Sequence, residues 1–391
     1  MEENTFPFNF EFKLQETEQP PYEQFPFGVD ISLQRFDERE GAFYSTRFVN
    51  EKMGGKNWRA RQASVATRKM LNEIPGYSQL EYAFSEAAWT SYRPYDAAPL
   101  MAWVEAPGQR RPVEKELKKR GHQWTGSPQE NSSHLKRAAN FFGAAAVGIT
   151  ATNELWFYAA DKEGLPIIFS PAHEHPVVTA EAKIIPTRLN RVIVMLVSQD
   201  RDLATFSPSP LAGAAVGQGY SHMAELASKT AAFIRGLGHE AIPMGNDTSL
   251  SVPLAIDAGL GEAGRHGMLL HPSYGSLVRI CKVLTDLPLE TDRSITFGAA
   301  DYCRSCTICA EHCPAKAISF HRDTTFETVC PSNNRGIKKW PVNSWACLKF
   351  WVNNGKDCGI CQAVCPFSRT SPVGLKKNDP LQWWHDQRST T

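Results

Sequence analysis

Apolar positions in the middle of the chain are spaced in two ways, and each spacing predicts one kind of element. NSSHLKRAANFF places apolar residues at helical spacing after serines that can cap a helix, so it predicts a helix from Asn131. SHMAELASKTAAFIRGLG predicts a longer helix, with Gly238 where a carboxyl-terminal cap belongs. RVIVMLVS is a continuous apolar, β-branched run, which predicts a strand covered on both faces.

Shorter runs continue this alternation. VGIT, ELWFY, AIP, MLLHP and SLVRICKVLTD predict strands, SVPLAIDAGL predicts a helix, and GLGEAGRHG predicts a glycine-rich loop. Helices and strands that alternate from about residue 131 to residue 290 indicate an α/β (α+β) domain. GLGEAG follows a helical segment instead of a strand, so the chain does not predict a dinucleotide site there.

The first third of the chain has a different character. Residues 1–125 are rich in proline, aromatic residues and charge, and their periodicity is weak. They predict an irregular arm that wraps the core, with short helices in ASVATRKMLNEI and EKELKKRG. We therefore expect three regions: the arm at 1–125, an α/β domain at 126–290 and a cysteine-rich domain at 291–391.

Charge and hydropathy exclude some classes of function. The 42 basic and 41 acidic residues give a net charge of +1, which lacks the basic excess of a nucleic-acid-binding protein. No apolar run approaches the length of a membrane span, which leaves only peripheral membrane association open. The beginning MEENTFPFNF has no export signal, so we expect a cytoplasmic protein; the alternative is twin-arginine export with the signal removed.

Eight of the ten cysteines form two motifs near the end of the chain. Cys303, Cys306, Cys309 and Cys313 follow the C-x2-C-x2-C-x3-C-P spacing of bacterial [4Fe–4S] ferredoxins. A second motif contains Cys358, Cys361 and Cys365, and its displaced first member is Cys347.

In such paired motifs the cysteine before proline usually ligates the other cluster. We therefore assign one cluster to Cys303, Cys306, Cys309 and Cys365, and the other to Cys313, Cys347, Cys358 and Cys361. Structural zinc and disulfides are the alternatives, but zinc knuckles do not need this doubled order, and disulfides would not favour these spacings. Cys281 and Cys330 are expected to be free thiols.

With this order of domains, the sequence resembles the corrinoid-dependent reductive dehalogenases from about residue 131 to residue 370. AIPMGN, AGLGEAGRHGMLLHPSYGSLVR and CPSNNRGIKKWP carry the resemblance together with the cysteines. It implies a nitroreductase-like corrinoid-binding domain followed by a ferredoxin-like domain with two [4Fe–4S] clusters. The corrinoid would be bound base-off, which agrees with the absence of a D-x-H-x-x-G motif from the sequence.

The resemblance also implies roles for individual residues. Catalytic roles fall on Tyr220 as proton donor, on Asn246 as its neighbour and on Arg279 as the activating basic residue. Corrinoid contacts fall on Ser221, Met244, Gly261, Arg265 and His266, and substrate-pocket walls on Trp351 and Trp156.

Each catalytic residue also has a plain structural interpretation. Tyr220 would pack beside the start of a helix, and Asn246 would only supply a turn before Asp247. Arg279 would form an ion pair with Glu262 or Asp286. Core packing is the corresponding interpretation of Trp156.

The implied reaction is the replacement of halogen by hydrogen on an organohalide, mediated by a Co(I) corrinoid with electrons delivered through the clusters. The electrons would come from an external donor such as a ferredoxin, a flavodoxin or a membrane-linked reductase.

Two other functions compete with reductive dehalogenation. Epoxyqueuosine reductase resembles this architecture and acts on tRNA, and a cobalt-free electron-transfer ferredoxin would need only the cysteines.

Overall fold

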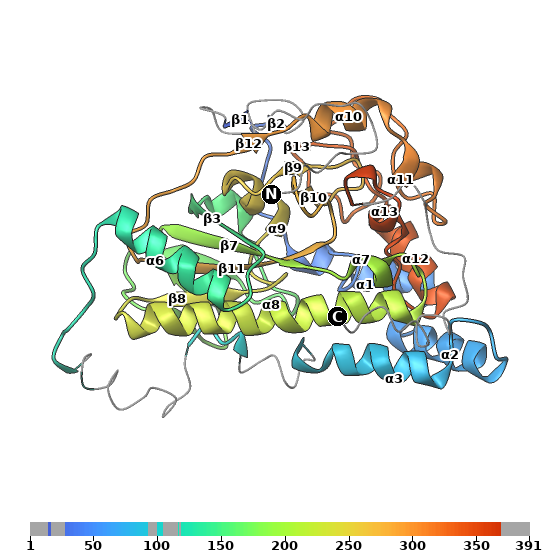
Figure 1. Ribbon diagram of the computed structural model, residues 1–391, viewed down its shortest axis with the longest axis horizontal. Coiled ribbons are helices and arrows are strands. Elements are labelled where there is room, and N and C mark those ends of the chain that lie inside the picture. The colour runs from blue at the N-terminus through green and yellow to red at the C-terminus, as the bar shows by residue number, and fades with distance from the viewer. Residues whose placement is uncertain (1–14, 17–27, 93–99, 105–115, 117–118, 369–391) are drawn as a thin grey trace, which may run out of the picture.

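The computed structural model describes residues 15–16, 28–92, 100–104, 116 and 119–368 (Figure 1). They form a mixed α/β structure in which a four-stranded sheet lies between helices and precedes a segment of short helices. The helices are α1 (Thr46–Met53), α2 (Trp58–Leu71), α3 (Gln79–Ala88), α6 (Pro128–Phe141), α7 (Arg201–Ala204), α8 (Pro210–Gly236), α9 (Ser251–Asp257), α10 (Ala299–Ser305), α11 (Ile308–Glu311), α12 (Ser344–Asn354) and α13 (Ile360–Ala363).

Most strands outside the main sheet are short. The strands are β1 (Gln15–Glu16), β2 (Gly28–Val29), β3 (Ala146–Ala151), β4 (Ile167–Ser170), β5 (Val177–Val178), β6 (Lys183–Pro186), β7 (Arg191–Ser198), β8 (Ala241–Met244), β9 (Glu262–Ala263), β10 (Leu269–Leu270), β11 (Val278–Thr285), β12 (Ile295–Thr296) and β13 (Ile337–Lys338). Short 3-10 helices are η2 (Glu38–Glu40), η3 (Thr90–Tyr92), η4 (Glu154–Trp156) and η5 (Pro366–Ser368).

The central sheet has the order β3–β7–β11–β8, and every neighbouring pair is antiparallel. β7 and β8 therefore run in the same direction on either side of β11. The prediction that RVIVMLVS is a strand covered on both faces is confirmed, because its side chains alternate between two hydrophobic clusters. Val192, Val194 and Leu196 belong to one cluster, and Ile193, Met195 and Val197 belong to the other.

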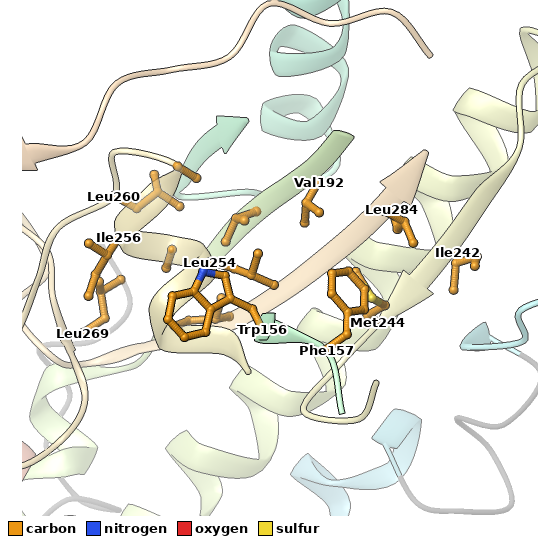
Figure 2. Close-up of a cluster of buried hydrophobic side chains, with 14 of the residues drawn as sticks. Trp156, Phe157, Val192, Ile242, Met244, Leu254, Ile256, Leu260, Leu269 and Leu284 are labelled. Atoms are coloured by element: carbon orange, nitrogen blue, oxygen red, sulfur yellow. The ribbon is translucent and has the colours of Figure 1, made fainter. Parts of the chain in front are cut away.

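The two faces of the sheet are covered by different elements. Leu135 of α6 and Met223 of α8 pack on the face that carries Ile193. Leu254 of α9 packs on the opposite face together with Trp156 (Figure 2). In Figure 1, α8 extends below the sheet as the longest helix.

Helix α8 begins eleven residues earlier than the apolar pattern predicts, at Pro210 instead of Ser221. Glycines make this early part useful, because they let other elements approach the helix closely. A Cβ atom on Gly213 would lie 2.3 Å from Cε of Lys356, and one on Gly217 would lie 2.4 Å from Cδ1 of Trp89. The glycines that weaken helix propensity are therefore the sites where the cysteine-rich segment and the amino-terminal region pack on α8.

Gly217→Ala should accordingly destabilise the protein by about 1–3 kcal/mol, the usual cost of forcing a methyl group into a packed site. Chemical denaturation of purified variants measures the effect. Gln218→Ala, at the exposed neighbouring position, is the control and should change stability by less than about 0.5 kcal/mol. Equal stabilities of the two variants would contradict the packing described for Trp89.

The amino-terminal region is not the irregular arm that its composition predicts. Its described part contains α1, α2 and α3, which are capped by Ser45, Asn57 and Ser78. Phe48 and Trp58 join α1 and α2 to α12 in one hydrophobic cluster, and Ser221 Oγ of α8 donates to the Ala88 carbonyl at the end of α3. Sparse apolar residues suffice because α8 and α12 supply the rest of the packing surface. The predicted helix in EKELKKRG falls largely outside the described residues.

Two local predictions are also corrected. ELWFY is not a strand: Glu154–Trp156 form η4, in which Asn153 accepts a hydrogen bond from the Leu155 amide. The helix predicted from Asn131 begins at Pro128, and Ser127 caps it through a capping box with Glu130. The glycine-rich loop contains a small hairpin in which β9 pairs with β10.

Hydrogen bonds fix the cysteine-rich segment to the α/β domain. Ser276 Oγ and Ser368 Oγ lie 3.0 Å apart, and the Gln362 amide donates to the Ser276 carbonyl. Asn354 Nδ2 donates to the carbonyl of Pro208, just before α8, at 2.8 Å. Among the described residues, no helix is long and apolar enough to cross a membrane.

Candidate functional site

Three residues with predicted catalytic roles meet at one place, although they come from different elements. Tyr220 lies on α8, Asn246 in the turn after β8, and Arg279 on β11. Asn246 Nδ2 donates a hydrogen bond to Tyr220 Oη at 2.8 Å, and the Arg279 guanidinium carbon lies 4.9 Å from the centre of the Tyr220 ring. The tyrosine therefore has an amide donor on its oxygen and a cation over its face.

The described residues do not support the competing structural interpretations of Tyr220 and Arg279. Tyr220 lies in the middle of α8 and cannot cap its start. The carboxylate of Glu262 accepts from the amides of Phe297 and Ala299, and Asp286 pairs with Arg188, so neither acid is the partner of Arg279.

Two aromatic residues that the sequence analysis did not single out complete the surroundings of Tyr220. Trp89 stacks on the Tyr220 ring with centroids 5.0 Å apart and an interplanar angle of 20°. Tyr92 of η3 lies 4.7 Å from the same ring, and burial raises the Tyr92 pKa well above its ordinary value. Both come from the amino-terminal region, where no local motif marks them as part of a site.

The turn that carries Asn246 is held by charged groups. Asp247 Oδ1 accepts from the Gly245 amide at 2.7 Å. Lys282 is fully buried and donates to the Ser249 carbonyl at 3.1 Å and to Ser251 Oγ at 2.8 Å. Burial lowers the pKa of Lys282 to about 8, and the charge of Asp247 opposes that shift.

Two hydrogen-bond donors without partners among the described residues lie beside α8, the helix that carries Tyr220. Nε of Arg279 and Nε2 of Gln199 are buried and have no partner among the described residues. A Cβ atom on Gly219 would lie 3.0 Å from Arg279 Cγ and 3.4 Å from Gln199 Cγ, so both side chains pack against α8 next to Tyr220. Buried donors are normally paired, and this pair fits a ligand that presents hydrogen-bond acceptors.

The amino-terminal region contributes a buried carboxyl group, that of Glu38, which interacts electrostatically with Asp247 in the turn after β8. Glu38 is 5% exposed, and its Oε2 has no partner among the described residues. Burial raises its pKa to about 7, helped by the charges of Asp247 and Asp161, while Lys162 acts in the opposite direction.

Glu38 should make stability depend on pH. The folded pKa of about 7 lies above the ordinary 4.5, so its favourable contribution is complete below pH 4.5 and is lost as pH rises to about 7. Between pH 5 and pH 8, wild type should lose up to roughly 3 kcal/mol relative to Glu38→Gln, by the usual conversion of pKa to free energy. Denaturation curves at both pH values measure this, with exposed Glu40→Gln as control. A Glu38→Gln protein with the wild-type pH profile would contradict it.

The cysteines gather in two sets. Cys303, Cys306, Cys309 and Cys365 surround one cavity, with an empty volume of about 280 Å³ that includes open solvent. Arg265, His266, Tyr302, Pro366 and Phe367 complete its lining. Cys365 thus joins the three cysteines of the first motif although it belongs to the second.

The remaining four cysteines form the second set. Cys313, Cys347 and Cys361 pack in one cluster beside Cys309. Burial raises the Cys358 pKa to about 11, and the charge of Cys313 adds to the shift. The two sets are therefore adjacent.

Burial makes these thiols poor acids in the absence of a cation. It raises the pKa of Cys303 to about 11 and that of Cys309 to about 12. Iron ligation requires thiolates, and the positive charge of iron would compensate for the lost hydration. Four convergent thiols, three of them buried, thus suit a metal cluster.

Arg265, to which the resemblance assigns a corrinoid contact, uses its guanidinium to bind backbone carbonyls of the cysteine-rich segment. Its guanidinium is fully buried and donates to the carbonyls of Cys303, Arg304, Cys306, Ser319 and His321. These bonds engage all five of its N–H groups. Arg265 therefore fixes the backbone around the first cysteine set.

His266 also belongs to the first cysteine set. It lines the cavity, its Nδ1 accepts from the Met268 amide at 3.2 Å, and its Nε2 is buried without a partner among the described residues. Burial lowers the His266 pKa to about 4. Gly261 lies in the same hairpin, where a Cβ atom would approach the Leu270 carbonyl oxygen to 2.0 Å.

The other predicted contacts are distributed over the molecule. Met244 and Trp156 are fully buried in the hydrophobic core, which agrees with the core-packing interpretation of Trp156 (Figure 2). Trp156 Nε1 donates to Asp257 at 2.7 Å. Ser221 is buried between α8 and the end of α3. Trp351 lies beside the second set: burial raises the pKa of Cys347 to about 12, and the Trp351 indole opposes that shift.

Comparisons with known proteins support both halves of this arrangement. Residues 173–289 match a family model described as reductive dehalogenase subunit, and residues 302–368 match one described as 4Fe-4S double cluster binding domain. A tetrachloroethene reductive dehalogenase of Desulfitobacterium hafniense is 38% identical over 282 residues, which cover 65% of this chain and 51% of that protein. The chain thus spans about half the length of the curated relatives it matches.

A solved reductive dehalogenase structure, described as suggesting a mechanism for B12-dependent dehalogenation, shares the fold with a TM-score of 0.64. The identity is 24%, and the match covers 91% of this chain and 44% of that one. A shorter match of 31% identity over 126 residues links the chain to epoxyqueuosine reductase of Lactococcus garvieae. The resemblance to the reductive dehalogenases is therefore confirmed: one region of the chain matches the reductive dehalogenase subunit model, and the region after it matches the 4Fe-4S double cluster binding model.

Proposed function

We propose that the protein is a reductive dehalogenase that replaces a halogen of an organohalide by hydrogen. The reaction consumes two electrons and one proton and releases a halide ion: the carbon–halogen bond breaks and a carbon–hydrogen bond forms. The observation that carries this proposal is the contact of Asn246 and Arg279 with Tyr220, in a chain that also gathers its cysteines into two sets.

The cysteine sets would hold two [4Fe–4S] clusters, which transfer electrons one at a time. We assign Cys303, Cys306, Cys309 and Cys365 to the first cluster, and Cys313, Cys347, Cys358 and Cys361 to the second. The adjacency of the sets suits electron transfer between them. The electrons would come from an external ferredoxin, flavodoxin or membrane-linked reductase.

Tyr220 would donate the proton. A phenol with a pKa of about 10 gives up its proton more readily when a cation stabilises the phenolate. The Arg279 guanidinium, 4.9 Å from the ring centre, is that cation. Asn246 holds the oxygen of Tyr220 through its amide hydrogen bond, which orients the hydroxyl group and favours the phenolate.

The residues around Tyr220 fit a corrinoid, since Gln199 and Arg279 offer buried donors and corrinoids carry amide acceptors. When bound, a base-off corrinoid would supply the low-valent cobalt that activates the carbon–halogen bond. Side chains of Trp89 and Tyr92 would restrict the space beside Tyr220 and exclude water from it. In fold terms, the corrinoid-binding region would be a nitroreductase-like domain and the cysteine-rich region a ferredoxin-like domain. The amino-terminal region would form a strap that packs over both.

Chlorinated ethenes are the first substrates to test, because a curated relative is named for tetrachloroethene. The protein should be purified without oxygen, supplied with cobalamin and analysed for iron and cobalt. About eight irons and one cobalt per chain are expected for two [4Fe–4S] clusters and one corrinoid. Halide release with a chemical reductant then measures the reaction. Iron without cobalt after reconstitution would favour an electron carrier, and turnover of epoxyqueuosine tRNA without halide release would favour that other enzyme.

A further inference from the structure

His266 is a buried residue whose Nε2 atom has no hydrogen-bond partner among the described residues. His266 is 6% exposed and lines the same cavity as the first cysteine set. Its hydrogen-bonding state follows from one contact. Nδ1 accepts a hydrogen bond from the Met268 amide, so Nδ1 carries no proton and the proton of the neutral ring is on Nε2.

The Nε2–H group has no acceptor among the described residues. A buried donor without an acceptor is unfavourable, because it has lost its hydrogen bond to water without gaining another. The neighbouring Arg265 differs, because carbonyl groups already engage all of its N–H groups. Of these two basic side chains in the cavity lining, only His266 has an N–H group that can donate a hydrogen bond to a group inside the cavity.

We propose that His266 donates an N–H···S hydrogen bond to the first [4Fe–4S] cluster and thereby raises its reduction potential. One-electron reduction adds negative charge to the cluster, and a donor directed at a sulfur atom stabilises the reduced state more than the oxidised state. His266 is thus a residue that tunes the potential, not a cluster ligand or a proton donor to substrate. The inference rests on the cluster assignment of the proposed function, but not on the dehalogenation reaction.

The chain contains a matched control. His271 is also a histidine of this region, and its Nδ1 accepts from the Ser273 amide at 3.0 Å, as that of His266 does from Met268. His271 does not line the cysteine cavity. His271→Phe therefore removes an equivalent ring and an equivalent local hydrogen bond without removing a donor from the cavity.

The test is a dithionite titration of the full-length, cluster-loaded protein, monitored by EPR. In His266→Phe, one of the two cluster potentials should fall by about 59 mV, which corresponds to a tenfold change for one electron. The other potential should stay unchanged. His266→Gln, which keeps an N–H donor, should restore at least half of the shift, and His271→Phe should leave both potentials at the wild-type values.

Unchanged potentials in His266→Phe with iron fully retained would overturn the proposal, and so would an equal shift in His271→Phe. If His266→Phe does not assemble its clusters, pulsed EPR of the wild-type protein with ¹⁵N-labelled histidine decides. A ¹⁵N coupling on one reduced cluster supports the hydrogen bond, and its absence refutes it. Halide release separates this result from the proposed function: a shifted potential in a protein that releases no halide would refute the reaction and leave the role of His266 intact.

Discussion

Dehalogenation by the Tyr220→Phe variant is expected to fall by about two to four orders of magnitude, the usual contribution of a positioned general acid. The substitution removes the hydroxyl group that receives the Asn246 hydrogen bond and keeps the ring that packs on Trp89 and Arg279. Iron content and the spectra of the bound cofactors should therefore match those of wild type. Halide release under anaerobic single-turnover and steady-state conditions measures the loss.

The control for this variant is Tyr274→Phe. Tyr274 packs against the hydrophobic cluster on the other face of the sheet, and its hydroxyl makes only a long, 3.4 Å hydrogen bond to the Ala145 carbonyl. It should retain nearly wild-type turnover. If Tyr220→Phe also turned over at near-normal rates, another group would have to supply the proton, and the role proposed for Tyr220 would be wrong.

Replacing Cys365 by alanine should remove the first cluster, although Cys365 belongs to the second sequence motif. It lines one cavity with Cys303, Cys306 and Cys309. The variant should hold about four irons instead of about eight, because each [4Fe–4S] cluster carries four. Iron analysis and EPR of the reduced protein give the count and identify the surviving signal.

The assignment predicts the reverse result for Cys358→Ala, which should lose the other cluster and keep the signal that Cys365→Ala loses. Cys330→Ser is the control, since Cys330 lies outside both sets and its thiol contacts Ser344 Oγ at 3.4 Å. It should retain all of its iron. Loss of the same EPR signal in Cys365→Ala and Cys358→Ala, with the other signal intact, would refute the crossed arrangement.

Elements with a strong local pattern could be predicted from the sequence. β7 is apolar at nearly every position because both of its faces are buried. The strand can therefore be predicted without knowing which elements cover it. The start of α8 could not be predicted in the same way. Gly213 and Gly217 oppose helix formation locally, and their value depends on Lys356 and Trp89, which are distant in sequence.

Helices α1 and α3 were not predicted, and only the second half of α2 was, for a related reason. α1 and α2 bury few apolar side chains of their own, and they are stabilised by packing on α12. The strand order of the sheet also has no local signal, because β11 lies between β7 and β8 although it follows both of them in the chain.

In the site, the resemblance to the reductive dehalogenases pointed to Tyr220, Asn246 and Arg279, and the structure brings these residues together. It did not locate Trp89 or Tyr92, which reach Tyr220 from a region without a motif. It also gave no sign that the Arg265 guanidinium binds the backbone around the first cysteine set, whereas the cysteine motifs did place Cys365 in that set.

The position of Cys365 beside the first three cysteines has a consequence for biosynthesis. A ribosome that has just completed the first motif has produced only three of the four thiols around that cavity, and the fourth is made near the end of the described chain. On the proposed assignment, the first cluster cannot be completed during synthesis of its own motif, and the second needs Cys313 from the earlier one. Cofactor insertion would then be a late, all-or-none event, so truncated chains should emerge without either complete cluster and be open to degradation.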